Sequence, residues 1–168
     1  MEFFGGVVAV LKSSVLKVVY FGRKYQCCKN VFSKKTYYLL LKYYSNKLGI
    51  EIVNWANIGS GFAMVHPYGI TITSEAVLGK NCILLKGSTI GYNRSSKTKR
   101  GAPILGDRVW MGCNSTIIGK VFIGNDVMIA ANTFVNFNVP DHSVVMGNPA
   151  TVRHVENPTK DYIYGVSK

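Results

Sequence analysis

Residues 105–135 read LGDRVWMGCNSTIIGKVFIGNDVMIAANTFV, with a large aliphatic residue or methionine at every sixth position. This six-residue repeat, which we call the beat, runs from residue 52 to residue 135. Its register shifts by two residues near Ile70 (the slip), and it is interrupted from residue 92 to 103 (the pause). Glycine follows the beat six times, at positions 59, 79, 91, 106, 112 and 124, where composition alone predicts about one. The thirteen beat residues are Ile52, Ile58, Met64, Ile72, Leu78, Leu84, Ile90, Leu105, Met111, Ile117, Ile123, Ile129 and Val135.

This repeat predicts a parallel β-helix over residues 51–150. Each unit is one short strand, whose aliphatic side chain points inward, followed by a tight corner that glycine or asparagine can adopt. Three units close a triangular coil of about 18 residues, and stacked coils pair their backbones with the coils on either side. We therefore expect a mainly β fold around an interior column of Ile, Leu, Val and Met.

The pause in the repeat, residues 92–103, reads YNRSSKTKRGAP and is too polar to enter such a core. It must leave the coil as a loop, and an insertion on a regular solenoid usually marks a binding face. The side chains that we expect to contact an acceptor there are Tyr92, Asn93, Arg94 and Arg100.

Residues 1–50 differ from the rest of the chain in charge and in periodicity. They hold nine basic residues and one acidic residue, whereas the remaining 118 hold eleven and seven. Apolar spacing predicts one helix over residues 3–21 and another over residues 36–47, with Gly49 as its stop. We expect these helices to pack together or to form an oligomer contact. Residues 151–168 are expected to form a C-terminal tail.

The basic segment would be attracted to any anionic partner, and charge alone does not choose among lipid, nucleic acid and phosphorylated ligands. Nucleic acid is not expected, because the basic side chains alternate with aliphatic ones rather than forming a known module. A peripheral membrane contact through residues 1–35 is the alternative to an oligomer contact. No apolar run is long enough to span a bilayer.

The four cysteines show no C-x-x-C pair and no metal-finger spacing. We therefore expect reduced thiols and a cytoplasmic protein, located at the inner face of the membrane if the peripheral contact exists. A zinc enzyme of β-helix type would need three converging histidines, but His142 and His154 lie at or beyond the last coil. No metal site is expected.

Several blocks along the repeat closely resemble the hexapeptide-repeat acyltransferases. They are GFAMVHPYGI at 61–70, STIG at 88–91, DRVWMG at 107–112 and VPDHSVVMGNPA at 139–150. The block around His66 is most similar to the serine acetyltransferase branch, which includes acetyltransferases of bacterial surface polysaccharides. Over about residues 50–152, the resemblance implies a left-handed β-helix, acetyl-CoA as the donor, and a homotrimer with active sites between subunits. It leaves open whether two trimers pair through their N-terminal helices.

Transfer of an acetyl group from a thioester to a hydroxyl requires a base that removes the hydroxyl proton. The resemblance assigns this role to His66. Glu51 lies fifteen residues earlier, close to one coil, and could orient the imidazole as the acid of a triad does. Related enzymes typically carry Asp at this offset. By spacing alone, Glu51 would be a solvated residue at the junction of helix and coil.

The resemblance also implies where the donor and the oxyanion bind. Backbone N–H groups near Gly91 and Tyr92 are expected to stabilise the oxyanion. The pantetheine arm is expected along the coil edge, where a small residue is usual, so we interpret Cys113 as filler rather than as a nucleophile. The residues implied in acetyl-CoA binding are Cys113, Ala131, Lys120 and Arg153, the last two for the phosphates.

Two departures from the serine acetyltransferases bear on the acceptor. Val65 stands where those enzymes usually carry an Asp that contacts serine, and Gly101-Ala102 stands where they usually carry Arg-His. These absences favour an acceptor hydroxyl on a sugar or surface-polysaccharide precursor. The alternatives are a serine O-acetyltransferase of cysteine biosynthesis and a non-catalytic β-helix scaffold.

Overall fold

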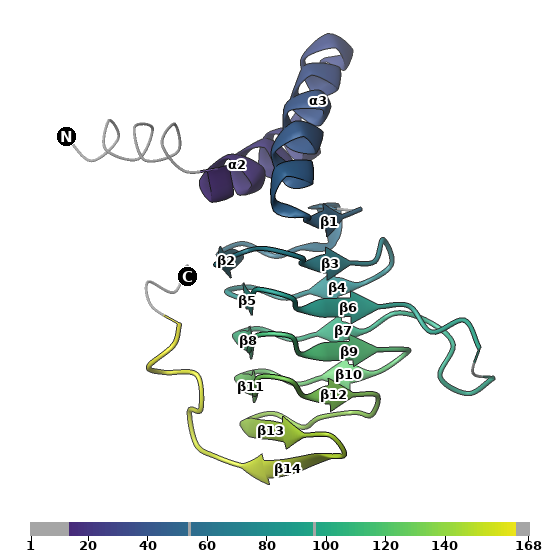
Figure 1. Cartoon of the computed structure of the whole chain (residues 1–168), viewed down its shortest axis with the longest axis vertical. Helices are drawn as coiled ribbons and strands as arrows, with labels where there is room; N and C mark the ends of the chain where they lie inside the picture. The colour runs from purple at the N-terminus through teal and green to yellow at the C-terminus, as the bar shows by residue number, and fades with distance from the viewer. Residues whose placement is uncertain (1–13, 54, 96, 164–168) are drawn as a thin grey trace. The chain divides into compact units, whose positions relative to one another are not determined.

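The computed structural model describes residues 14–53, 55–95 and 97–163 of the chain. The chain divides into two compact units, Met1–Ile50 and Glu51–Lys168 (Figure 1). The first unit is helical and the second is a β solenoid.

The helical unit contains α2 (Ser14–Cys27) and α3 (Val31–Leu48). Gly49 ends α3 in the left-handed conformation at φ 60°, which confirms it as the stop. Helix α3 begins five residues earlier than the repeat of apolar residues predicted, because the Asn30 side chain accepts a hydrogen bond from the Ser33 N–H (3.1 Å) and caps it. The predicted first helix covers residues 3–21, of which residues 3–13 lie outside the described residues. Its remaining part lies in α2, which continues to Cys27.

Aromatic contacts join the two helices. The Phe21 ring stacks on Tyr44 with 5.8 Å between centroids and lies 6.4 Å from Tyr37. Leu41 and Leu48 are buried on the same side of α3. The predicted apolar stripe of α3 is therefore packing surface within this unit.

The solenoid has three faces, each a sheet of parallel strands, and the chain passes through them in the order C, A, B in each coil (Figure 1). Face A contains β1 (Glu51–Ile52), β3 (Thr71–Ile72), β6 (Thr89–Gly91), β9 (Thr116–Ile118) and β12 (Phe134–Val135). Face B contains β4 (Val77–Leu78), β7 (Ile104–Leu105) and β10 (Phe122–Ile123). Face C contains β2 (Ala63–Val65), β5 (Ile83–Leu85), β8 (Val109–Met111), β11 (Val127–Ile129), β13 (Ser143–Gly147) and the antiparallel β14 (Ala150–His154).

The core is the column that the six-residue beat predicted. Every beat residue except the half-buried Ile52 is buried. A second set of inward residues lies two positions before the beat, because alternate residues of a strand share a face. Phe62 and Ile70 of this set are large, but from Ala76 onward its members are no larger than valine. The buried hydroxyls of Ser88 and Ser115 donate to the carbonyls of Leu85 (2.6 Å) and Gly112 (2.7 Å).

The B–C corners show why glycine follows the beat. A Cβ at Gly79 would lie 2.5 Å from the Gly106 carbonyl oxygen of the next coil, so no larger residue fits without a shift. The adjacent residues form a ladder, in which the side chain of Asp107 accepts from the Lys80 N–H (2.7 Å) and that of Asn125 accepts from the Asp107 N–H (2.8 Å). Close stacking and backbone satisfaction therefore both depend on these corners.

The described part of the C-terminal segment, residues 150–163, folds back onto the solenoid. Strand β14 pairs antiparallel with β13, so the predicted tail from residue 151 begins as a strand. Further on, the Tyr162 ring lies 5.0 Å from Trp110, and the Thr159 hydroxyl donates to Oδ1 of Asp126 (2.5 Å). The tail is thus held by one aromatic contact and one buried carboxylate.

Asp126 is 1% exposed, accepts from Thr159 and from Nδ1 of His142 (2.9 Å), and forms an ion pair with Arg108 (3.5 Å). Burial alone would raise the pKa of this carboxyl, but the hydrogen bonds from Thr159 and His142 and the charge of Arg108 outweigh it, so the pKa lies below its ordinary value. A carboxyl with a lowered pKa adds stability above the ordinary carboxyl range, and this stability is lost as the pH falls through the folded-state value.

We expect Asp126→Asn to lower the free energy of unfolding by about 1–3 kcal/mol, because it weakens the hydrogen bonds of a buried acceptor. The deficit should be full at neutral pH and should shrink below about pH 4. Thermal unfolding from pH 3 to pH 8 measures it, with the exposed Asp161→Asn as control. Equal unfolding of both variants at pH 7 would contradict the structural role of Asp126.

Candidate functional site

His66 lies at the C–A corner, directly after β2. The register shows two extra residues there: Val65 pairs with Leu85, 20 residues later, but Thr71 pairs with Thr89, 18 residues later. This is the slip seen in the sequence. It makes this corner longer than the other C–A corners, and His66 takes a positive φ of 49° within it. The imidazole is therefore presented at the surface rather than in the core.

The corners stacked next to His66 form one edge of the solenoid. Continuing the strand register by one or two residues places Lys86, Cys113 and Ala131 on successive coils from His66. Two backbone hydrogen bonds support this order: the Asn114 N–H donates to the Lys86 carbonyl (2.9 Å), and the Asn132 N–H donates to that of Cys113 (2.9 Å). At about 4.8 Å per coil, this edge extends about 14 Å from His66 to Ala131. We call it the His66 edge.

Sequence reasoning missed Lys86. Its side chain is exposed on the coil between His66 and Cys113, and only the strand register across the two-residue slip places it there. It places a cationic side chain beside His66.

Glu51 lies on face A, paired with Thr71 of the strand that follows the His66 corner. The Glu51 side chain is exposed, whereas the next residue, Ile52, belongs to the core column. Among the described residues, no hydrogen bond or ion pair joins the Glu51 carboxylate to the His66 imidazole. The orienting role of Glu51 stays a prediction.

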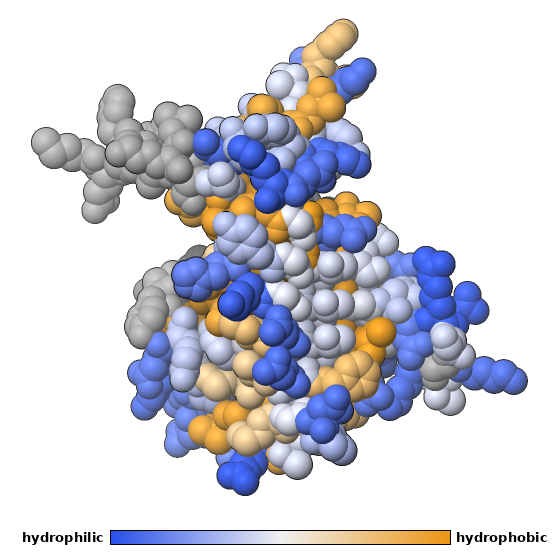
Figure 2. All heavy atoms as spheres, in the orientation of Figure 1, coloured by the Kyte–Doolittle hydropathy of each residue, from blue (hydrophilic) through white to orange (hydrophobic). Residues whose placement is uncertain are grey.

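The predicted loop leaves face A at its other end, the A–B corner. Gly91 ends β6, and the backbones of Asn93 and Gly101 exchange two hydrogen bonds (2.9 and 3.2 Å), so the excursion is a hairpin. Its base is tied to later coils, because Nζ of Lys99 donates to the Asn136 carbonyl (2.7 Å) and the Lys120 N–H donates to the Lys99 carbonyl (3.0 Å). Figure 2 shows the loop as a strongly hydrophilic projection from the solenoid.

The predicted site residues thus form two groups in one chain. His66, Cys113 and Ala131 lie along the His66 edge. At the A–B corner, on the far side of the face A strands, lie Gly91, Tyr92, Asn93, Arg94, Arg100 and Lys120. Arg153 belongs to neither group, since it lies on β14 opposite Val144 of face C. The roles given to these residues stay predictions.

No cluster of three or more His, Cys, Asp or Glu side chains suited to a metal ion occurs in the described parts of the chain. The four cysteines are free thiols, and burial raises the pKa of Cys82 to about 12. Within residues 14–163 as described, no helix is both long and apolar enough to cross a membrane.

The structure is a hexapeptide-repeat β-helix with an exposed histidine at a lengthened corner and a polar hairpin on the neighbouring coil. This is the arrangement of elements that the resemblance to acyltransferases leads us to expect. No protein-family model matches the chain. It is 38% identical to serine acetyltransferase 2 of Arabidopsis thaliana over 111 residues, covering 66% of this chain and 34% of that protein. It is 35% identical to serine acetyltransferase of Helicobacter pylori over 102 residues, covering 61% and 59%.

Among solved structures, the serine acetyltransferase of Neisseria gonorrhoeae matches with a TM-score of 0.72 and 28% identity, over 94% of this chain and 61% of that one. These comparisons confirm the resemblance to the hexapeptide-repeat acyltransferases: the chain is a left-handed parallel β-helix similar to the serine acetyltransferases. They give no support to the polysaccharide branch. The chain spans less than two thirds of the length of each of these relatives.

Proposed function

We propose that the protein is an O-acetyltransferase that moves an acetyl group from acetyl-CoA to a hydroxyl, with His66 as the general base. The observation that carries this proposal is the exposed His66 on a lengthened corner, at one end of the His66 edge, in a chain similar to serine acetyltransferases.

In the proposed reaction, the His66 imidazole takes the proton of the acceptor hydroxyl while its oxygen attacks the thioester carbonyl. Backbone N–H groups near Gly91 and Tyr92 stabilise the oxyanion of the tetrahedral intermediate. The intermediate then collapses and expels the CoA thiolate, which receives the proton from the imidazolium. Glu51 would keep the imidazole oriented during both proton transfers.

The donor is proposed to lie along the His66 edge. Cys113 is half-buried and Ala131 exposes only a methyl group, so their coil edges leave room for a pantetheine arm. Lys120 and Arg153 are exposed cations suited to the phosphates of CoA, although neither lies on the His66 edge of the same chain, whereas Lys86 is a third exposed cation and does lie on that edge.

We expect His66→Asn to lower kcat by at least about 100-fold, because a general base contributes on that order. Asparagine tolerates the positive φ of 49° at this corner, so folding should be retained. Thiol release from acetyl-CoA measures activity, and the exposed His154→Asn is the matched control. Unchanged turnover in the folded His66 variant would contradict its role as base.

The two groups of site residues also support a site between chains. His66 and the hairpin lie at opposite ends of the face A strands, about 10 Å apart for three residues, and on different coils. A cyclic trimer would bring the A–B corner of one chain to the C–A corner of the next. We propose such a homotrimer, in which each site takes His66 from one subunit and the hairpin from its neighbour.

Hybrid trimers test this arrangement. One parent is His66→Asn. In the other, residues 94–100 are replaced by a two-residue turn, which the paired Asn93 and Gly101 can accept. Each parent should be inactive, whereas random hybrids of equal amounts should recover about a quarter of wild-type activity, because each mixed trimer holds one intact site. Hybrids as inactive as their parents would indicate a site within one chain.

The comparisons favour serine as the acceptor, because the relatives described above are serine acetyltransferases. One observation favours a sugar hydroxyl as a second candidate. Val65, next to the base, is 40% exposed, so a valine side chain rather than a carboxylate faces the place where an acceptor approaches His66. A carboxylate there would pair with the amino group of serine, and valine cannot.

Val65→Asp should raise kcat/KM for L-serine by about tenfold or more, since a charge-assisted hydrogen bond contributes about 1.5–3 kcal/mol. Thiol release with serine and with nucleotide sugars measures the change. Val77→Asp is the matched control, because Val77 is also 40% exposed on a strand of the solenoid. High serine turnover by the unmodified protein, with no gain from the substitution, would show that residue 65 does not decide the acceptor.

A further inference from the structure

The helical unit carries an unbalanced charge. Between residues 14 and 50 there are eight basic side chains and no acidic one. Between these two positions no carboxylate side chain balances the positive charge, so the field of this segment attracts anions.

Helix α3 presents two different sides. One side packs within the helical unit through Tyr37, Leu41, Tyr44 and Leu48, as described above. The other side exposes large apolar residues: Phe32 is 85% exposed, Val31 77% and Leu39 59%. We call this side the α3 outer face; its residues are Val31, Phe32, Lys34, Lys35, Tyr38, Leu39, Lys42, Tyr43 and Lys47.

The helical repeat of 100° per residue puts these nine residues on one continuous face, with lysines among the apolar side chains. Figure 2 shows hydrophobic and hydrophilic residues side by side on the helical unit. At 18 residues, the helix is about 27 Å long, and the mixture extends over its whole length. A surface facing only water would not expose apolar residues of this size together.

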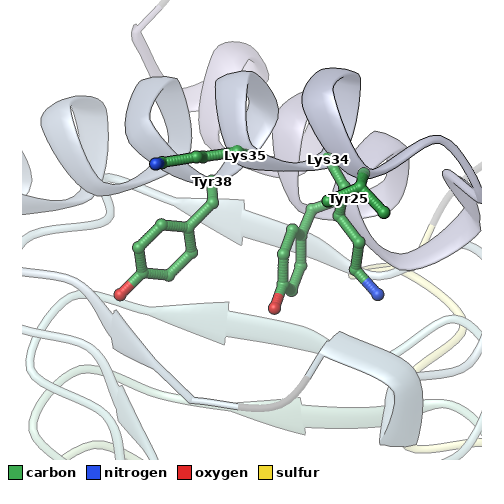
Figure 3. A pocket seen from close by; sticks show the side chains of 5 residues that line it. Tyr25, Lys34, Lys35 and Tyr38 are labelled. Carbon is green, nitrogen blue, oxygen red and sulfur yellow. The ribbon is translucent and has the colours of Figure 1, made fainter.

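A hollow of about 290 Å³ opens on this face, lined by Tyr25, Val31, Lys34, Lys35 and Tyr38. In Figure 3, the Tyr25 and Tyr38 rings lie side by side with both hydroxyls pointing the same way, and a lysine amine lies on each flank. The ring centroids are 5.7 Å apart, and Nζ of Lys34 lies 5.2 Å from the Tyr25 centroid. Aromatic hydroxyls next to ammonium groups suit the level of lipid headgroups, where one end of a side chain is apolar and the other wet.

We propose that the α3 outer face binds the surface of an anionic lipid bilayer. The helix lies in the plane of the interface: Val31, Phe32 and Leu39 enter the acyl boundary, while the lysines contact lipid phosphates. The hollow between Tyr25 and Tyr38 receives a headgroup. This inference does not depend on the proposed acetyl transfer.

Charge decides between this occupant and two others. A second copy of the same face would bring lysines against lysines with no acidic residue to pair them, which opposes a symmetric contact. A nucleic acid would neutralise the lysines but would leave Val31, Phe32 and Leu39 without an apolar partner. An anionic bilayer satisfies both kinds of side chain.

Co-sedimentation of the full chain with vesicles tests the proposal. Binding should be strong to phosphatidylcholine vesicles containing phosphatidylglycerol, and at least tenfold weaker to pure phosphatidylcholine. Lys34→Gln/Lys35→Gln should reduce binding several-fold and lower its salt dependence, whereas Lys80→Gln/Lys160→Gln, which removes two exposed lysines of the solenoid, should not. Phe32→Ser/Leu39→Ser should lose binding even at low salt, with Val152→Ser/Val155→Ser as its control.

Insertion depth provides a second measurement. Phe32→Trp should add a fluorescence component that shifts to shorter wavelength on vesicles and is quenched by brominated acyl chains. Absence of binding to anionic vesicles would overturn the proposal. Two further results would also overturn it. In the first, Phe32→Ser/Leu39→Ser binds vesicles fully and the protein binds an oligonucleotide duplex with equal affinity. In the second, this variant forms a smaller oligomer while its vesicle binding is unchanged.

Discussion

The fixed spacing between neighbouring strands is the constraint on which the rest of the solenoid depends. Each coil lies about 4.8 Å from the next, and from Ala76 onward each face of a coil places one large beat residue and one smaller residue in the interior. The aliphatic beat follows from this, and so does the glycine at the B–C corners, where a Cβ at Gly79 would meet the backbone of the next coil. The ladder through Asp107 and Asn125 satisfies the amides that such close stacking exposes.

A regular lattice of this kind makes every departure visible. Two extra residues lengthen the corner at His66, and nine extra residues lengthen the coil that carries the hairpin, since Gly91 pairs with Ile118, 27 residues later. Neither insertion adds to the core, and each presents polar groups to solvent. The proposed chemistry is therefore assigned to the places where the chain departs from its own repeat.

The interior could be predicted from the sequence because a large aliphatic residue or methionine at the same place in every six-residue unit leaves a periodic signal. Gly49 was also predictable, because few residues other than glycine end a helix in the left-handed conformation. The small inward residues such as Ser88 were not, because their type varies with local hydrogen bonding rather than with position. The same holds for the anchoring of the tail on Asp126, a contact between residues 33 positions apart that no local pattern records.

The sequence suggested candidate site residues one by one, but not Lys86 and not their arrangement. The His66 block resembles a known family, yet the place of Lys86 next to it follows only from the strand register across the slip. The division of the site between two ends of face A likewise depends on which corner each insertion occupies. A linear sequence shows that both insertions exist, and only the coil geometry shows that they point to different edges.

Two features of the structure, independent of the similarity to serine acetyltransferases, bear on the identity of the acceptor. Val65 removes a charge from the approach to His66, whereas the α3 outer face concentrates charge and apolar surface on a separate unit. An enzyme acting on freely diffusing serine gains nothing from binding a bilayer, but one acting on a lipid-linked sugar gains effective concentration at the surface. Membrane binding together with serine turnover that is low in the unmodified protein and rises in Val65→Asp would therefore favour the sugar, and a serine-active protein that does not bind vesicles would favour the activity of its relatives.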